Sequence, residues 1–347
     1  MAEVAQRVHW PWPVLVMQPT TYAVPQEAAG ARLDAWLAAQ LENVSRARVQ
    51  LLLSDSKVLV NGASAKPSLR LRGGETVEVL GEPVPPPLRA IPESIPLDVV
   101  YEDDDLSVIN KPAGMMVHVG SGATDDARNR GTLVNALLSH YADLSHSADP
   151  MRPGIVHRLD KQTSGLIIVA RNDAAHHKLG EMFSRREIRK TYVALVHGAV
   201  KQDHGTISTP ISRDIIRRTR MTTRREVGAR TALSHYTVLE RIDSRFGKFT
   251  LVSVRIETGR THQIRVHLAS IGHPVIGDTL YGAPGKIPVI GPRKKSDPEP
   301  ETIALHRNFL HAAELEFAHP TTGKQLTLKA PLPEELQFFQ QKLMANS

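Results

Sequence analysis

One short segment concentrates residue types that can act on a substrate. Residues 154–165 read GIVHRLDKQTSG and place a single carboxylate, Asp160, between the cations Arg158 and Lys161. The apolar run over residues 166–170 follows at once and predicts a buried strand. A polar turn that leads into a buried strand holds its side chains on a rigid support and leaves them open to substrate. Asp160 is therefore a candidate catalytic carboxylate.

A second polar cluster lies in the segment ETGRTHQIRVHLASIGHPVIGDTLYG, residues 257–282. The spacing of its apolar residues predicts an amphipathic helix over residues 261–271. Arg265 is expected to be half-buried beside the apolar face of this helix. A half-buried guanidinium requires an anion. We expect Asp160 to be that anion.

A third segment, EIRKTYVALVHG, alternates between inward and outward positions over residues 188–196. The alternation predicts a strand on which Tyr192, Ala194 and Val196 share one face. On such a face Tyr192 is either an ordinary core residue or a flat ring available to a planar ligand. The residues of this segment alone leave both interpretations open.

The composition limits the classes of chemistry. The chain has 347 residues, 41% of them hydrophobic, and contains no cysteine. Disulfides, thiolate nucleophiles and cysteine-ligated metals are therefore excluded. No uninterrupted apolar run approaches the ~18 residues of a membrane span, and the N-terminus lacks the pattern of an export signal. We expect a cytoplasmic monomer that has no transmembrane helix and uses neither a metal nor a cofactor.

The positive charge is concentrated in the middle of the chain. The net charge is +7, and residues 185–230 alone contain 12 Lys/Arg against 4 Asp/Glu. Within them, the tract 213–230 is too polar for a core helix and predicts a loop or hairpin. Arginine-rich clusters favour phosphate because the guanidinium binds oxyanions in a bidentate manner. We therefore predict that Arg217, Arg218 and Arg220 bind RNA.

Changes in composition divide the chain into segments. Residues 1–27 lack periodicity and predict a flexible arm, and residues 28–81 predict a small α+β unit of two helices and a short sheet. Six prolines predict a semi-rigid linker over residues 82–96. Residues 97–347 predict an α+β domain with a mixed, largely antiparallel central sheet and flanking helices. Within that domain, residues 283–302 are expected to form a mobile excursion.

Three residues are expected to cap helices. Ser45 precedes the second helix of the small unit, and Thr132 precedes a helix that ends near residue 141. Asp173 is expected to cap a further helix that ends near residue 183. These helices flank the strands that carry the polar segments.

The small unit resembles the S4 RNA-binding domain. The resemblance rests on SRARVQLLLSDSKVLVNG followed by KPSLRLRGGETVEV. It implies that this unit docks on RNA through basic residues, namely Arg46, Arg48, Lys57, Lys66 and Arg70. Without the resemblance the unit is a generic α+β module with a basic face.

The larger domain resembles the RluA-type pseudouridine synthases, which convert uridine in RNA to its C-glycoside isomer. The resemblance rests on INKPAGMMVH, HRLDKQTSG, the strand segment and the segment around HQIR, which occur in the family's order. It implies that Asp160 is the essential carboxylate and that Arg265 is its ion-pair partner. It further implies that Tyr192 stacks on the target uracil and that Arg158 is a wedge in the RNA. The similarity is greatest to the branch that modifies large-subunit (23S) ribosomal RNA.

The implied reaction suits a solitary carboxylate. Isomerisation breaks the C1′–N1 bond, turns the base and joins C1′ to C5. Hydrolytic glycosidases generally use two carboxyl groups, because one protonates the leaving group and the other handles water or the anomeric carbon. Uracil leaves as a delocalised anion and no water takes part, so Asp160 alone is sufficient. A base inside folded RNA must first flip out, at a cost of a few kcal/mol.

Two other functions compete with this hypothesis. A non-catalytic RNA-binding protein explains the charge and the S4-like unit without any chemistry. A metal-dependent hydrolase is suggested by the 16 histidines. It is disfavoured because His262 and His267 are five positions apart, unlike the i, i+4 pair of zinc-binding helices.

Overall fold

The computed structural model describes residues 19–41, 44, 46–80, 90–118, 130–141, 144–145, 152–217, 219–225, 227–292 and 299–345. The chain divides into two compact units, Met1–Leu88 and Arg89–Ser347. The division lies within residues 82–96, where we predicted a linker. Each unit has its own hydrophobic core.

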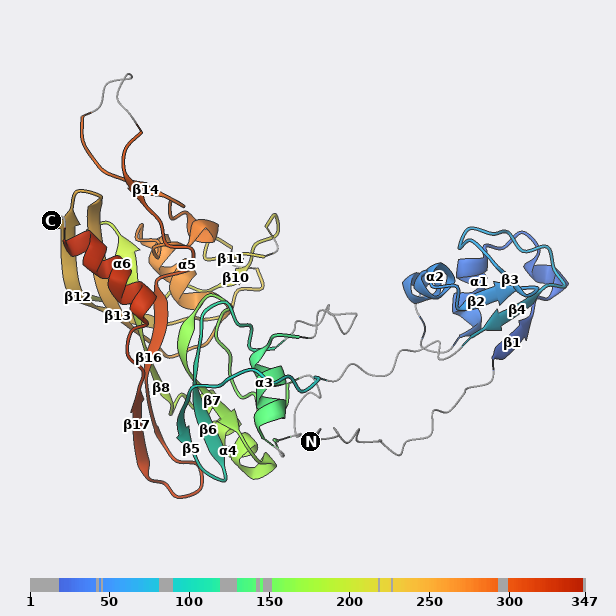
Figure 1. The fold of residues 1–347 in the computed structure, drawn as a ribbon, viewed down its shortest axis with the longest axis horizontal. Helices are drawn as coiled ribbons and strands as arrows, with labels where there is room; N and C mark the ends of the chain where they lie inside the picture. The colour runs from blue at the N-terminus through green and yellow to red at the C-terminus, as the bar shows by residue number, and fades with distance from the viewer. Residues whose placement is uncertain are drawn as a thin grey trace, which may run out of the picture. The chain divides into compact units, whose positions relative to one another are not determined.

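The first unit packs two helices against a four-stranded sheet (Figure 1). Its elements are β1 (Thr20–Ala23), η1 (Gln26–Ala28), α1 (Leu33–Gln40), α2 (Arg46–Ser54), β2 (Val58–Val60), β3 (Ala63–Ser64) and β4 (Thr76–Val79). The strand order is β1-β4-β2-β3. Leu33 and Leu37 on α1 are fully buried, as the helical spacing predicts, and they pack with Leu52 on α2 and Val58 on β2.

The N-terminal edge of this unit differs from the prediction. Residues 20–23 were expected in the flexible arm, but they form β1, which pairs antiparallel with β4 and sets Tyr22 opposite Val77. Val24, the next residue, is buried in the core. A four-residue edge strand is too short to show a periodicity, and its pairing depends on a strand that begins 53 residues after β1 ends. Residues 1–18 of the predicted arm and the predicted cap Ser45 lie outside the described residues.

The second unit contains a large mixed sheet (Figure 1). Its strands run in the order β5-β6-β7-β16-β8-β13-β12-β9, and β17 pairs with β16. Every pairing in this sheet is antiparallel except that of β7 with β16. The strands are β5 (Val99–Glu102), β6 (Leu106–Lys111), β7 (Ser164–Ala170), β8 (Arg189–His197), β9 (His204–Ile207), β12 (Ser234–Ser244), β13 (Gly247–Ile256), β16 (Leu310–Ala318) and β17 (Gln325–Lys329). The predicted α+β class with a largely antiparallel sheet is confirmed.

Four α-helices accompany this sheet in the described part of the unit. They are α3 (Leu133–His140), α4 (Asp173–Ser184), α5 (Gln263–Ser270) and α6 (Glu334–Met344). Thr132 caps α3 as predicted, in a reciprocal pair with Asn135. At α4 the cap is Asn172, whose side chain accepts from the Ala175 backbone N–H, so the assignment to Asp173 was wrong by one residue. None of the described helices is long and apolar enough to cross a membrane.

The segment predicted as a mobile excursion carries short pairings in its described part. β14 (Ile287–Pro288) pairs antiparallel with β15 (Thr302–Ile303). Ile287 and Ile303 are buried against the main core, which accounts for the pairing. Another short ribbon, β10 (Ser212–Arg213) with β11 (Met221–Thr222), forms in the basic tract, where a loop or hairpin was predicted.

The parallel pairing of β7 with β16 fixes the segment that carries Asp160. Gly165 sits at the start of β7 with a φ of 112°, and a Cβ atom there would lie 2.3 Å from the carbonyl oxygen of Ala312 on β16. Only glycine allows that approach. Because β7 is buried along its whole length, the loop before it has little freedom to move.

Candidate active site

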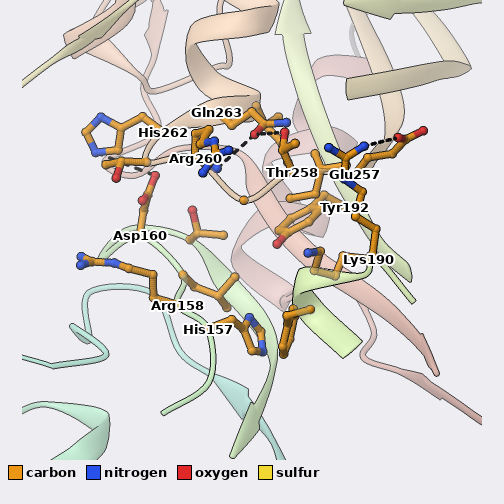
Figure 2. A pocket seen from close by; sticks show the side chains of 18 of the residues that line it. His157, Arg158, Asp160, Lys190, Tyr192, Glu257, Thr258, Arg260, His262 and Gln263 are labelled. Carbon is orange, nitrogen blue, oxygen red and sulfur yellow. Dashed lines mark hydrogen bonds and ion pairs between the residues drawn. The ribbon is translucent and has the colours of Figure 1, made fainter. Parts of the chain in front are cut away.

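A cavity of about 580 Å³ opens where the loop before β7, strand β8 and the loop before α5 meet (Figure 2). Asp160 comes from the first of these elements, Tyr192 and Lys190 from the second, and His262 from the third. The C-terminal end of α4 closes one side with Phe183. The three polar segments singled out in the sequence therefore converge on one cavity.

The loop that carries Asp160 is held by contacts on both sides of it. His157 accepts the Ile168 backbone N–H at 2.8 Å through Nε2, and its ring packs on Phe183 with centroids 4.7 Å apart. Burial lowers the pKa of His157 to about 3, so this imidazole is neutral and serves as an anchor. After the aspartate, the Thr163 backbone N–H donates to the Asp160 carbonyl oxygen at 3.1 Å. The loop thus presents Asp160 in one position.

Arg265 lies between two carboxylates. Its Nη1 is 3.0 Å from Oδ2 of Asp160, which is the ion pair that the sequence predicted. Its Nε and Nη2 donate to Asp278 at 2.6 and 2.9 Å, in a bidentate arrangement. Arg265 and Asp278 are buried, whereas the Asp160 side chain is 19% exposed. Despite burial, the hydrogen bonds and charges of Asp278 and Asp160 raise the pKa of Arg265, which therefore remains a cation.

His262 faces the same carboxylate in a strained backbone conformation. Its φ of 56° is in the left-handed region, and its Nε2 is 3.9 Å from Oδ2 of Asp160. Its Nδ1 is 2.9 Å from the hydroxyl of Tyr281, which already accepts the Met221 backbone N–H. The hydroxyl proton is therefore available to Nδ1, which places the imidazole proton of the neutral ring on Nε2. Burial lowers the pKa of His262, which favours this neutral form.

Tyr192 lies on the buried face of β8 and lines the cavity (Figure 2). Ala194 and Val196 share that face, as predicted. Burial, together with the charge of Asp160, raises the pKa of Tyr192. The ring is therefore a neutral phenol that can stack on a ligand, and it is poorly suited to accept a proton.

Arg158 lies at the rim of the cavity and is exposed. Its Nη1 is 3.3 Å from Nε2 of His118, and in Figure 2 its guanidinium points away from Tyr192. A cation in this place is accessible to a large polyanion without filling the cavity itself.

The remaining predicted RNA-binding residues do not line this cavity. Lys57 and Arg217 are exposed, and Arg48 is partly buried. Arg46 is tied to the fold, because its Nη2 is 3.1 Å from the buried Asp34. The other members of the predicted set, Lys66, Arg70, Arg218 and Arg220, differ in their surroundings. Lys66 is exposed, and Arg70 is exposed and donates to the Gly30 carbonyl oxygen. Arg218 lies outside the described residues, and the Arg220 guanidinium lies over the Tyr281 ring, 5.4 Å from its centroid.

Among the described residues, one group has the residue types and the spacing that a metal ion could use. Asp103, Asp105 and His319 bring their ligand atoms within 4.8 Å of one another. His319 Nδ1 accepts the backbone N–H groups of Thr321 and Thr322, so its proton lies on Nε2, 2.8 Å from Asp103. A metal would need the lone pair that this proton occupies. The group is a hydrogen-bonded clamp between two turns and does not line the cavity.

Comparison with known proteins defines the class. Residues 105–270 match the RNA pseudouridylate synthase family, and residues 31–77 match the S4 domain. The chain is 42% identical over 321 residues to an uncharacterized RNA pseudouridine synthase of Bacillus subtilis, covering 92% of this chain and 97% of that protein. The chain therefore belongs to the RNA pseudouridylate synthase family and is an isomerase that acts on RNA. Both predicted resemblances are confirmed.

The chain is also similar to a ribosomal RNA synthase and to a solved structure of the family. The chain is 42% identical over 325 residues to the ribosomal large subunit pseudouridine synthase D of Xanthomonas campestris, covering 93% of this chain and 92% of that protein. The solved structure of human RNA pseudouridylate synthase domain containing 1 covers 72% of this chain and 96% of its own, with 27% identity and a TM-score of 0.50.

Sequence reasoning missed several residues of the site. Asp278 and Tyr281 lie in the GDTLYG segment, which was quoted for its resemblance but given no role. The signal for Asp278 was the buried Arg265, whose five donors exceed what one carboxylate can accept. Lys190 could have been found because it is two positions from Tyr192, and alternate residues of a strand share a face.

Proposed function

We propose that this protein isomerises uridine to pseudouridine at specific positions of 23S ribosomal RNA, with Asp160 as its essential carboxylate and with the target nucleotide flipped out of the RNA. The ribosomal target is supported by the similarity to synthases D of the large subunit. The roles of Asp160, Arg265, Tyr192 and Arg158 are inferred from geometry and from the family resemblance.

The observation that carries the proposal is the state of the Asp160 carboxylate. Oδ2 accepts from Arg265, whereas no described residue donates a hydrogen bond to Oδ1. The cavity in front of it has a volume of about 580 Å³, within the range of roughly 300–1,000 Å³ common for small-ligand sites. A nucleoside-sized group that enters this cavity meets one carboxylate oxygen with a free lone pair.

In this arrangement Asp160 acts on the ribose and Tyr192 holds the uracil. As C1′–N1 breaks, positive charge develops on the ribose, and the free oxygen of Asp160 is placed to stabilise it or to react with it. The electron pair leaves with the uracil, which must stay in the cavity and turn until C5 faces C1′. Stacking on Tyr192, worth about 1–3 kcal/mol, retains the detached base and still permits rotation in its plane.

Entry of the nucleotide requires that the RNA stack be opened. Arg158, exposed at the rim two residues before Asp160, is placed to occupy the gap that the flipped nucleotide leaves. We expect Arg158→Ala to slow turnover on structured RNA more than on a flexible strand, because only the former has a stack to replace. Equal losses on both RNAs, measured as single-turnover rates, would contradict the wedge role.

The proposal is tested by mapping pseudouridines in ribosomal RNA from cells with and without the gene. We expect specific pseudouridines to disappear from 23S RNA and to return with the wild-type gene, but not with Asp160→Asn. Loss of sites in transfer RNA only would overturn the ribosomal target. Return of the sites with Asp160→Asn would overturn the role of the carboxylate.

A further inference from the structure

Two lysines are buried in the described part of the chain, and they differ in their partners. Lys111 is fully buried and its Nζ donates to the carbonyl oxygens of Pro112 and Met115 at 2.7 and 2.9 Å. Lys190 is 91% buried, since its relative exposure is 9%, yet no described residue forms a hydrogen bond or an ion pair with its amine. The amine lies over the face of Phe183, 5.1 Å from the ring centroid.

Burial without an anionic partner disfavours the charged form of an amine. Burial lowers the pKa of Lys190 to about 8 for this reason. Lys190 lines the cavity two residues before Tyr192, so both side chains lie on the same face of β8. In Figure 2 its amine lies on the same side of the cavity as the Tyr192 hydroxyl. A cation left without an anion in a substrate cavity indicates that the substrate brings the anion.

We infer that Lys190 is a further catalytic residue, whose ammonium donates a hydrogen bond to a carbonyl oxygen of the detached uracil and stabilises its negative charge. This inference rests on the proposed function. When C1′–N1 breaks, both electrons stay on the base and are delocalised over N1, C5 and the two carbonyl oxygens. No proton needs to pass to the base while this bond breaks, and the negative charge disappears when C5 bonds to C1′. The product is then completed when C5 loses its proton and N1 gains one, so no net proton is taken up or released.

An RNA phosphate is the alternative anion, and the position of Lys190 disfavours it. Phosphates run along the outside of the strand and are matched by exposed cations such as Arg158 at the rim. A side chain that is 91% buried is reached only by a group that enters the cavity, and the base is that group. The base would also lie beside Tyr192, next to Lys190.

The first experiment compares Lys190→Met with the exposed control Lys178→Met on α4. For Lys190→Met we expect a single-turnover rate about 10²–10³-fold lower, the usual effect of losing one donor to a developing anion. RNA affinity should change less than about threefold, and the melting temperature should stay equal or rise, because a buried charge is removed. Lys178→Met should change none of these. A rate within threefold of wild type, or a loss confined to RNA affinity with a smaller salt dependence, would overturn the inference.

The second experiment uses the pH dependence of kcat/KM. Besides Lys190, the titratable or charged groups that line the cavity are His157 and Tyr192, both neutral, together with Arg158, Asp160, Arg186, Glu257, Arg260 and His262. We therefore expect the wild-type value to fall as pH rises through about 8, where the amine loses its proton.

Lys190→Arg keeps the charge at every accessible pH, so it should retain part of the rate and lose the alkaline fall. An unchanged fall in this variant would contradict the assignment, even if Lys190→Met does not fold. If the wild-type protein makes no pseudouridine, the proposed function fails; if it does and Lys190→Met matches it, only this inference fails.

Discussion

Two clusters of carboxylate and guanidinium, one in each unit, use the same groups in opposite proportions. In the small unit, one buried carboxylate, Asp34, binds two guanidiniums, with Nη2 of Arg32 at 3.0 Å and Nη2 of Arg46 at 3.1 Å. In the large unit, one guanidinium, Arg265, binds the two carboxylates of Asp160 and Asp278.

This difference determines which cluster keeps a carboxylate oxygen that accepts no hydrogen bond from the described residues. Both oxygens of Asp34 accept hydrogen bonds, and its side chain is fully buried, so it stabilises the fold. Asp278 takes two of the donors of Arg265, which leaves Asp160 with one donor and a free oxygen. Where guanidiniums outnumber carboxylates, both oxygens of the carboxylate accept hydrogen bonds. Where carboxylates outnumber guanidiniums, one oxygen is left without a donor among the described residues.

The largest effect is expected from Asp160→Asn. We expect the single-turnover rate to fall about 10⁴-fold or more, because the reacting oxygen loses its charge. RNA affinity and melting temperature should change little, because the side chain is partly exposed and Arg265 keeps Asp278. Asp34→Asn is the matched variant and should leave the rate at saturating RNA unchanged. A tenth of the wild-type rate in Asp160→Asn would contradict the contrast between the clusters.

The next effect is expected from Asp278→Asn. An amide offers only one acceptor to Arg265, so the guanidinium loses its bidentate support and its charge is under-compensated. We expect a loss of about 3 kcal/mol in the free energy of unfolding, typical of a broken buried pair, and a rate about 10–10²-fold lower. Denaturant unfolding and single-turnover kinetics measure the two. An unaltered rate with lower stability would mean that Asp278 serves only the fold.

Asp34→Asn should act on stability alone. Losing the charge-assisted hydrogen bonds should cost the small unit about 1.5–3 kcal/mol. In the wild type, the hydrogen bond from Arg32 holds the pKa of Asp34 far below its usual range. This stabilisation is therefore present above about pH 4, the pKa of the unfolded chain, and is lost as pH falls below it. Unfolding curves of the two proteins should converge in acid, and a constant gap down to pH 2 would disprove the linkage.

The smallest effect is expected at an exposed arginine. Arg217→Gln should lower the slope of log affinity against log salt by about 1 and leave the rate at saturating RNA unchanged. Arg241→Gln is a control, because Arg241 is already bound to Asp203 at 2.7 Å. Filter binding at several salt concentrations measures both. An unaltered slope for Arg217→Gln would mean that the segment between β10 and β11 does not contact the RNA.

Local patterns sufficed for much of the fold and for the centre of the site. The alternation around Tyr192 and the burial of Arg265 could each be predicted from the sequence of one strand or helix. Placing either residue beside Asp160 required one further assumption about how distant segments meet. The capping pair at Thr132 was also readable, because its partner lies three residues away.

The features that were missed depend on distant segments. β1 exists because β4 pairs with it, and four residues carry no period of their own. Asp278 meets Arg265 only because the chain turns back after α5, at Gly277, where a Cβ atom would lie 1.9 Å from the carbonyl oxygen of Arg307. Such turns are determined by tertiary contacts, and the spacing of apolar residues in the helix does not predict them.

The pairing of β7 with β16 has a consequence for how a newly made copy becomes active. Ser164, at the start of β7, bonds His311 of β16, which lies 147 positions later in the chain. During translation the segment with Asp160 is made long before its neighbouring strand, and parallel pairing over such a separation forms slowly. An unfinished chain therefore lacks the strand that pairs with the start of β7, and we expect the segment with Asp160 to reach its final position only after β16 has left the ribosome.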